Sequence, residues 1–106
     1  MPKYLVRANY TTKGIQGLVA DSASGRRSDV TAAIKAAGGK VEAFYFAFGD
    51  DDVIFIADLP NNISVAAATI AAAATGALRV RTTPLLTVEE VDQALEVQTG
   101  YRAPGA

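Results

Sequence analysis

The chain has 106 residues, with 10 Lys and Arg against 11 Asp and Glu, and it contains no His and no Cys. A chain of this length fits one domain that can bury a hydrophobic core without disulfides or metals. The missing residue types exclude imidazole bases, thiol nucleophiles and zinc ribbons, and a net charge of −1 gives no electrostatic footprint for nucleic acid or anionic membranes. Half of the residues are apolar, and because 21 of them are alanines, the core must be built from small side chains.

The ends of the chain and its longest apolar stretch bear on localisation and domain limits. The N-terminal residues include no apolar segment of signal-peptide length. The stretch from Ile63 to Leu78 is interrupted by polar residues and is shorter than the ~20 residues that cross a bilayer. We therefore expect a cytoplasmic protein without a membrane partner. The composition of Gly100 to Ala106 predicts one domain over residues 1–99 and a flexible tail over residues 100–106.

Periodicity predicts a strand, a helix and a second strand in the first half of the chain. Tyr4 to Tyr10 alternates as a strand does. A helical pattern starts at Thr12, is weakened by glycines up to Gly25, and becomes firm after Arg26. The second strand is expected from Val41 to Phe48, and its residues divide between two faces: Phe44, Phe46 and Phe48 on one, and Val41, Ala43, Tyr45 and Ala47 on the other.

A tight hairpin turn is expected at Gly49 to Asp52, with a positive φ at Gly49 that a valine would strain. Val53 to Leu59 returns as a third strand that is apolar on both faces up to Asp58. Ile63 to Thr75 is an alanine-rich helix that we expect to pack closely on the sheet. Its expected inner stripe consists of Ile63, Ala67, Ile70, Ala71 and Ala74.

The last third of the chain predicts a strand and a helix. Leu78 to Thr83 alternates as a fourth strand that Pro84 closes, and Thr87 to Glu90 reads as a capping box that opens a final helix. The element order β-α-β-β-α-β plus a helix predicts an α+β, ferredoxin-like fold, in which an antiparallel four-stranded sheet carries two helices on one face.

With its elements in this order, the chain resembles the GYD domain family, a group of small proteins largely of unknown function, from about Lys3 to Glu90. The segments that carry the resemblance are Tyr10-Thr11-Thr12-Lys13-Gly14, Gly38-Gly39-Lys40, Phe44-Tyr45 ahead of Phe48-Gly49, Asp52-Val53, Leu59-Pro60-Asn61, Val80-Arg81-Thr82 and Thr87-Val88-Glu89-Glu90. Where the family has Gly-x-Tyr-Asp, this chain has Asp51 in place of the Tyr. Any role of that Tyr is therefore absent.

The resemblance also implies an assembly. The family is similar to the dimeric α/β-barrel superfamily, in which two ferredoxin-like sheets pack face to face. That superfamily includes cofactor-free monooxygenases, haem proteins and ligand-sensing domains, so it implies an architecture and not one function.

Three arginines and a tyrosine are the candidate ligand-binding residues: Arg7, Tyr45, Arg79 and Arg81. The arginines lie on strands one and four, which are neighbours in this fold, so their guanidinium groups can cluster. Asp58 or Glu42 could supply acidic partners. The cluster is interpreted as an ion-pair network at an interface or as a pocket for a small carboxylate or phosphate.

The triplet Asp50 to Asp52 invites a metal-site interpretation, but adjacent hairpin residues point in divergent directions. We expect a solvated turn, no metal site, no cofactor and no recognisable catalytic residue. Whether the chain is an enzyme stays open at this stage.

Three functions remain: a small oligomeric binding or scaffold domain, a cofactor-independent enzyme of monooxygenase type, and a small-ligand sensor. A deep apolar cavity lined by Tyr and Arg would favour the last two, and a filled core the first. Because strands two and three have no polar face, one sheet face is left apolar. We therefore expect a homo-oligomer with a dimer as its minimum unit, unless the C-terminal helix covers that face.

Overall fold

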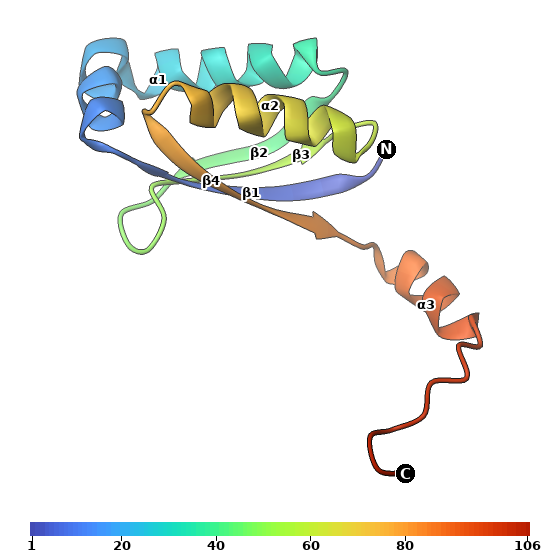
Figure 1. Cartoon of the computed structure of the whole chain (residues 1–106). Helices are drawn as coiled ribbons and strands as arrows, with labels where there is room; N and C mark the ends of the chain where they lie inside the picture. Colours follow the sequence, from blue (N-terminus) through green and yellow to red (C-terminus); the bar gives the residue numbers. More distant parts are fainter.

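A computed structural model describes all 106 residues, and it confirms the ferredoxin-like fold (Figure 1). The elements in chain order are β1 (Lys3–Tyr10), α1 (Thr12–Ala36), β2 (Lys40–Phe46), β3 (Val53–Asp58), α2 (Asn62–Ala74), β4 (Leu78–Leu85) and α3 (Val88–Glu96). The sheet has the order β2-β3-β1-β4, and each pair of neighbouring strands is antiparallel. Both α1 and α2 cover the same face of the sheet (Figure 1).

The core lies between the sheet and the two helices. Alternate side chains of the central strands point to this side, and they meet residues from α1, α2 and the β3–α2 connection. The buried core residues are Tyr4, Val6, Ala8, Ile34, Val53, Phe55, Ala57, Leu59 and Val65. The remaining side chains of the same strands therefore point away from the helices.

That second side of the sheet carries no helix, and we call it the open face. It consists of Lys3, Leu5, Arg7, Asn9, Lys40, Ala43, Tyr45, Ile54, Ile56, Asp58, Arg79, Arg81, Thr83 and Leu85. The strand register aligns these residues in rows across the sheet, and one row is formed by Tyr45, Ile54, Arg7 and Arg81. The chemistry of the open face is thus set by the residues that alternate with the core.

The predicted division of β2 between two faces is wrong at its start. Val41 and Ala43 lie opposite Ala57 and Ile56, which are adjacent in β3, so Glu42 is an extra residue that forms a bulge. The bulge reverses the alternation, and Val41 packs against the core instead of sharing a face with Ala43. The strand also ends at Phe46, two residues earlier than expected.

The loop between β2 and β3 is also different from the expected tight turn. It spans residues 47–52, and Gly49 in it has no positive φ and has open space around its Cα. The loop is fixed by Asp52, whose backbone N–H donates to Ala8 O over 2.9 Å and whose carboxylate accepts from the N–H of Tyr10 over 2.8 Å. The expectation that Gly49 is required was therefore wrong, because side-chain anchoring replaces turn geometry.

Helix α1 contains the predicted break, located at Ser22, whose φ is 73°. The Ser22 hydroxyl accepts a hydrogen bond from the N–H of Gly25, as an N-cap does for a new helix. The helical segment that follows carries Ile34 into the core.

The predicted inner stripe of α2 is wrong at its two isoleucines, although Ala67 and Ala71 do face the space between helix and sheet. Val65 is buried and Ala68 packs against the core, whereas Ile63 and Ile70 are 80% and 67% exposed. Almost every residue of α2 is apolar, so the pattern does not select one face. The hydrogen bond from Tyr4 Oη to Asn62 Oδ1, 2.8 Å long, instead ties the start of the helix to β1.

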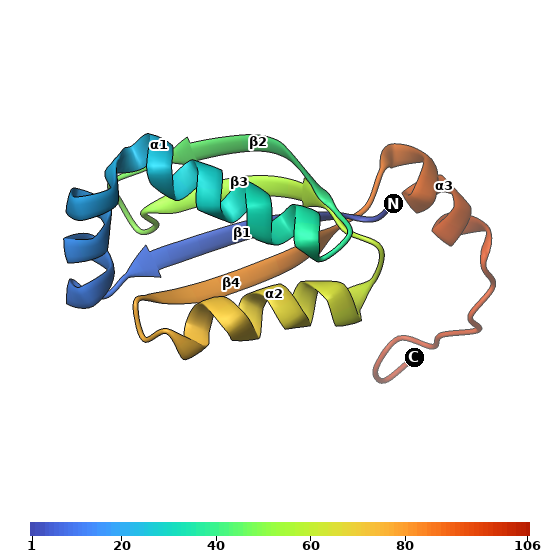
Figure 2. The ribbon, with the colours of Figure 1, turned by 90° about the horizontal axis from the view of Figure 1, so that it is seen from above.

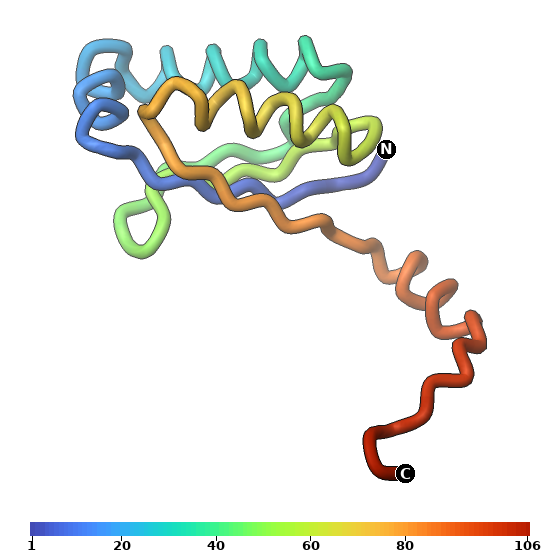
Figure 3. The backbone as a smooth tube through the Cα atoms, viewed as in Figure 1, coloured from blue at the N-terminus to red at the C-terminus, as the bar shows by residue number.

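The end of the chain leaves the domain. Pro84 does not close β4, because at a sheet edge one row of N–H groups needs no partner, and the strand continues to Leu85. Helix α3 begins with the predicted capping box between Thr87 and Glu90. It buries none of its residues and stands beyond the end of the sheet (Figures 1 and 3), so it does not cover the open face. None of the three helices combines the length and apolar character needed to cross a membrane.

Candidate functional site

The arginines of the open face converge on one acidic residue, Asp51. One Asp51 oxygen accepts a hydrogen bond from Arg81 Nη2, and the other lies 3.8 Å from Arg7 Nη1. The Asp51 side chain is only 10% exposed, while those of Arg7 and Arg81 are 37% and 53% exposed. The 47–52 loop holds Asp51 there, because Asn9 Nδ2 also donates to the carbonyl of Asp50.

Asp58 and Glu42 are not the partners of these arginines, contrary to the sequence-based expectation. Both bind Lys3, with Nζ to carboxylate distances of 2.8 Å to Asp58 and 2.9 Å to Glu42. The register explains the difference, because Lys3 and Asp58 are cross-strand partners at the opposite end of the sheet from Asp51.

The Lys3 cluster changes the protonation of its members. A side-chain hydrogen bond from Lys3 lowers the pKa of Asp58 below its usual 3.8, against the opposing effect of burial. The hydrogen bonds to Asp58 and then Glu42 raise the pKa of Lys3 above 10.5. The fold therefore favours the ion pair over both neutral forms.

The four predicted ligand-binding residues all lie on the open face, and three of them, Arg7, Tyr45 and Arg81, share one row. Arg79 lies in the next row opposite Asn9 and forms no ion pair within the chain. Because Asp51 balances part of the charge of Arg7 and Arg81, the geometry fits an ion-pair network better than a strong anion pocket.

The three aspartates of the loop have separate environments. Asp51 pairs with arginines, Asp52 accepts from the backbone of Tyr10, and the Asp50 side chain is exposed. No three acidic side chains in the chain gather in a way that could hold a metal ion. The special position of Asp51 had no signal in the sequence, because its two partners are more than 25 residues away along the chain.

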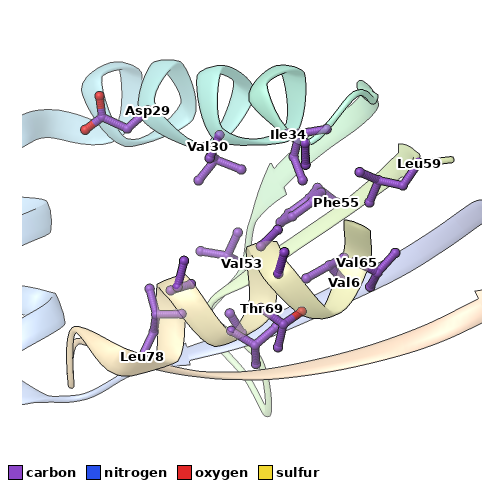
Figure 4. Close-up of a pocket in the computed structure, with 18 of the residues that line it drawn as sticks. Val6, Asp29, Val30, Ile34, Val53, Phe55, Leu59, Val65, Thr69 and Leu78 are labelled. Atoms are coloured by element: carbon purple, nitrogen blue, oxygen red, sulfur yellow. The ribbon is translucent and has the colours of Figure 1, made fainter. Parts of the chain in front are cut away.

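A cavity of about 570 Å³ lies between the helices and the sheet. It exists because α1 lies over β2 and α2 over β4 (Figure 2), while the helix residues that face the gap are short: Ala33, Ala37, Ala68 and Ala72. Figure 4 shows Val30 and Ile34 pointing from α1 toward Val53 and Phe55 of β3. Helix α2 therefore packs on the sheet as expected, through Val65 and Ala68, but less closely than expected because most of its inward residues are alanines.

The cavity lining is apolar except at a few positions. Of its 21 lining residues 18 are hydrophobic, and the polar or charged ones are Arg26, Asp29 and Thr69. Arg26 Nη1 lies 3.1 Å from Asp29 and 3.6 Å from Asp21, so the arginine enters the lining as part of an ion-pair cluster. Tyr10 adds an aromatic ring.

We predict that Asp51→Asn lowers the free energy of unfolding by about 1 kcal/mol, because Arg7 and Arg81 lose a charged acceptor but remain partly hydrated. Urea unfolding followed by circular dichroism, at fixed protein concentration, measures the change. Asp50→Asn is the matched control and should match the wild type, because only the Asp50 backbone carbonyl makes a contact. Equal stabilities for Asp51→Asn and the control would show that the ion pairs contribute nothing.

We predict that Asp58→Asn lowers the melting temperature at neutral pH and that this difference vanishes in strong acid. Because the folded pKa of Asp58 is depressed, its contribution is complete above 3.8 and is lost as the pH falls through the lower folded value. Thermal melts over an acid pH series measure it, with Asp50→Asn as the control because the Asp50 side chain is exposed and makes no contact. A constant difference down to strong acid would contradict this assignment.

One protein family matches the chain. A family model described as GYD domain matches residues 4–95, which run from the second residue of β1 to the penultimate residue of α3. No curated protein and no solved structure gives a significant match. The matched range is most of the chain, and so the protein belongs to the GYD domain family.

Proposed function

We propose that this protein binds a small, largely apolar molecule in the cavity between its helices and its sheet, and that it works as a homodimer. The cavity is the observation that carries the proposed binding. Its volume of about 570 Å³ lies in the range of about 300–1,000 Å³ common for small-molecule sites. Aliphatic and aromatic walls of this extent favour binding of an apolar molecule by removing its surface from water.

The polar groups of the lining limit the charge of the ligand. Asp21 and Asp29 together outnumber Arg26, so this cluster carries a net charge of −1 and leaves no free cation for an anionic ligand. An uncharged molecule with one polar group fits this arrangement, because a buried anionic group would lack a counter-ion. Tyr10 and Arg26 line the cavity, which is the feature expected of a small-molecule site rather than of a scaffold with a filled core. Arg26 and Asp29 are engaged with each other in an ion pair, which supports binding over catalysis.

We predict that an uncharged fluorescent probe of apolar sites, N-phenylnaphthylamine, binds the wild-type protein and that Ala68→Leu weakens this binding at least about tenfold by filling the cavity. The same substitution should raise the melting temperature, because it restores packing contacts. Fluorescence titration and thermal melts measure the two effects.

Ala73→Leu is the matched control for Ala68→Leu. Ala73 lies on the same helix but is exposed and does not line the cavity, so the control should bind the probe as the wild type does. Unchanged probe affinity in folded Ala68→Leu protein would contradict the proposed site.

The open face supports the second half of the proposal, the homodimer. Its centre is formed by Leu5, Ile54 and Ile56, aliphatic side chains on the two middle strands with no helix above them. A second open face could cover them, because sheets stack face to face through such side chains. The partly exposed Arg7 and Arg81, held by Asp51, would then lie beside this apolar centre.

We predict a dimer at micromolar concentration in light scattering coupled to size exclusion, and a monomer for Ile54→Lys. A lysine at this position would place an unpaired charge in the apolar centre of the interface. Ile70→Lys puts the same charge on the exposed side of α2 and should remain a dimer. A monomeric wild-type protein would refute the dimer and leave the cavity proposal to its own test.

A further inference from the structure

Helix α3 is an amphipathic helix that has no partner in its own chain. Val88, Val91 and Leu95 repeat at the spacing of one helical face, and they are 75%, 42% and 78% exposed. A helix of nine residues is too short to be stable alone in water, where about 12–15 residues are marginal. The apolar face of α3 therefore needs a surface to cover it.

The charge of α3 indicates which surface fits. The helix has four acidic side chains and no basic one: Glu89, Glu90, Asp92 and Glu96. Asp92 and Glu96 are four residues apart, so they flank the apolar face on one side. The open face has the opposite charge at its β4 margin, where Arg79 has no acidic partner within the chain.

The acidic side chains of α3 are badly placed to pair with Arg79 of the same chain. Arg79 lies near the start of β4 and α3 follows the end of that strand, so about six residues, or roughly 20 Å, separate Arg79 from Leu85. If α3 folded back beneath its own sheet, its nine residues would extend only about 13 Å and would end short of Arg79. In the structure it points away from the sheet, on the side of the open face (Figure 1).

In a two-fold dimer, α3 of one copy can reach the Arg79 of the other copy. An axis that runs across the strands, between two stacked open faces, reverses the strand direction in the second copy. The end of β4 in one copy then lies over the start of β4 in the other, beside its Arg79. Helix α3, which follows Leu85, therefore reaches the start of β4 of the second copy without reversing its direction.

We infer that α3 is an exchanged arm, which packs its apolar face on the β4 margin of a second copy and places Asp92 and Glu96 against Arg79 there. This inference rests on the proposed dimer and adds the segment that secures it. Exchange of one element between identical chains requires no new surface, because each copy supplies one arm and one arm site.

Charge reversal in trans tests the arm. Arg79→Glu and the double variant Asp92→Arg with Glu96→Arg should each weaken self-association at least about tenfold, because each places like charges together. An equimolar mixture of the two should form the mixed dimer in excess over both self-dimers in native mass spectrometry. Arg27→Glu, an exposed α1 residue with no ion pair, is the matched control and should neither weaken the dimer nor prefer the α3 variant.

The outcomes separate the arm from the dimer. A statistical mixture of dimers would overturn the exchanged arm while leaving the sheet-to-sheet dimer intact. Hydrogen exchange adds an independent measurement, with protection of the Val88–Glu96 amides expected in the dimer and lost in dissociated Ile54→Lys protein. Equal protection in that monomer would show that α3 docks on its own chain and would overturn the inference. A wild-type protein that is monomeric would overturn the proposed dimer and the arm with it.

Discussion

Strand β3, in the middle of the sheet, is apolar on both faces up to Asp58, and much of the structure responds to that constraint. Val6 and Phe55 need cover on one side, and Leu5 and Ile56 on the other. A ferredoxin-like chain has only two helices between its strands, and both lie on one side of the sheet. The helices cover one apolar surface within the chain, and the proposed dimer would remove the other from water.

The ion pairs at the two ends of the open face serve different purposes in this arrangement. Lys3, Asp58 and Glu42 form a partly hydrated cluster that contributes modestly to stability. Asp51 is more buried, and it pairs with two arginines beside the apolar centre. Without this carboxylate, the two arginines would repel each other. Asp51 stands where the resemblance to the Gly-x-Tyr-Asp pattern implies a Tyr, and in this chain its carboxylate pairs with the two arginines.

The sequence predicted the strands well, because the alternation in β1 and β4 is a direct consequence of a sheet with two distinct faces. It located the α1 break and the capping box of α3 for the same reason, since both depend on residues close together in the chain. The sequence-based prediction failed where the pattern of apolar residues did not select one face, or where the contacting residues are far apart in the chain. The alanines of α2 define no face, the bulge at Glu42 changes the alternation without a turn residue, and the partners of Asp51 come from other strands.

The shortness of the helix side chains has a further consequence for the response of the protein to pressure. Unfolding floods internal voids with water, so a domain with a large unfilled cavity loses volume when it unfolds, and compression favours the unfolded state. The space between Ala68, Ala72 and the strands is a void of this kind whenever no molecule occupies it. A bound molecule of matching shape would remove most of that volume change and so protect the folded state against pressure.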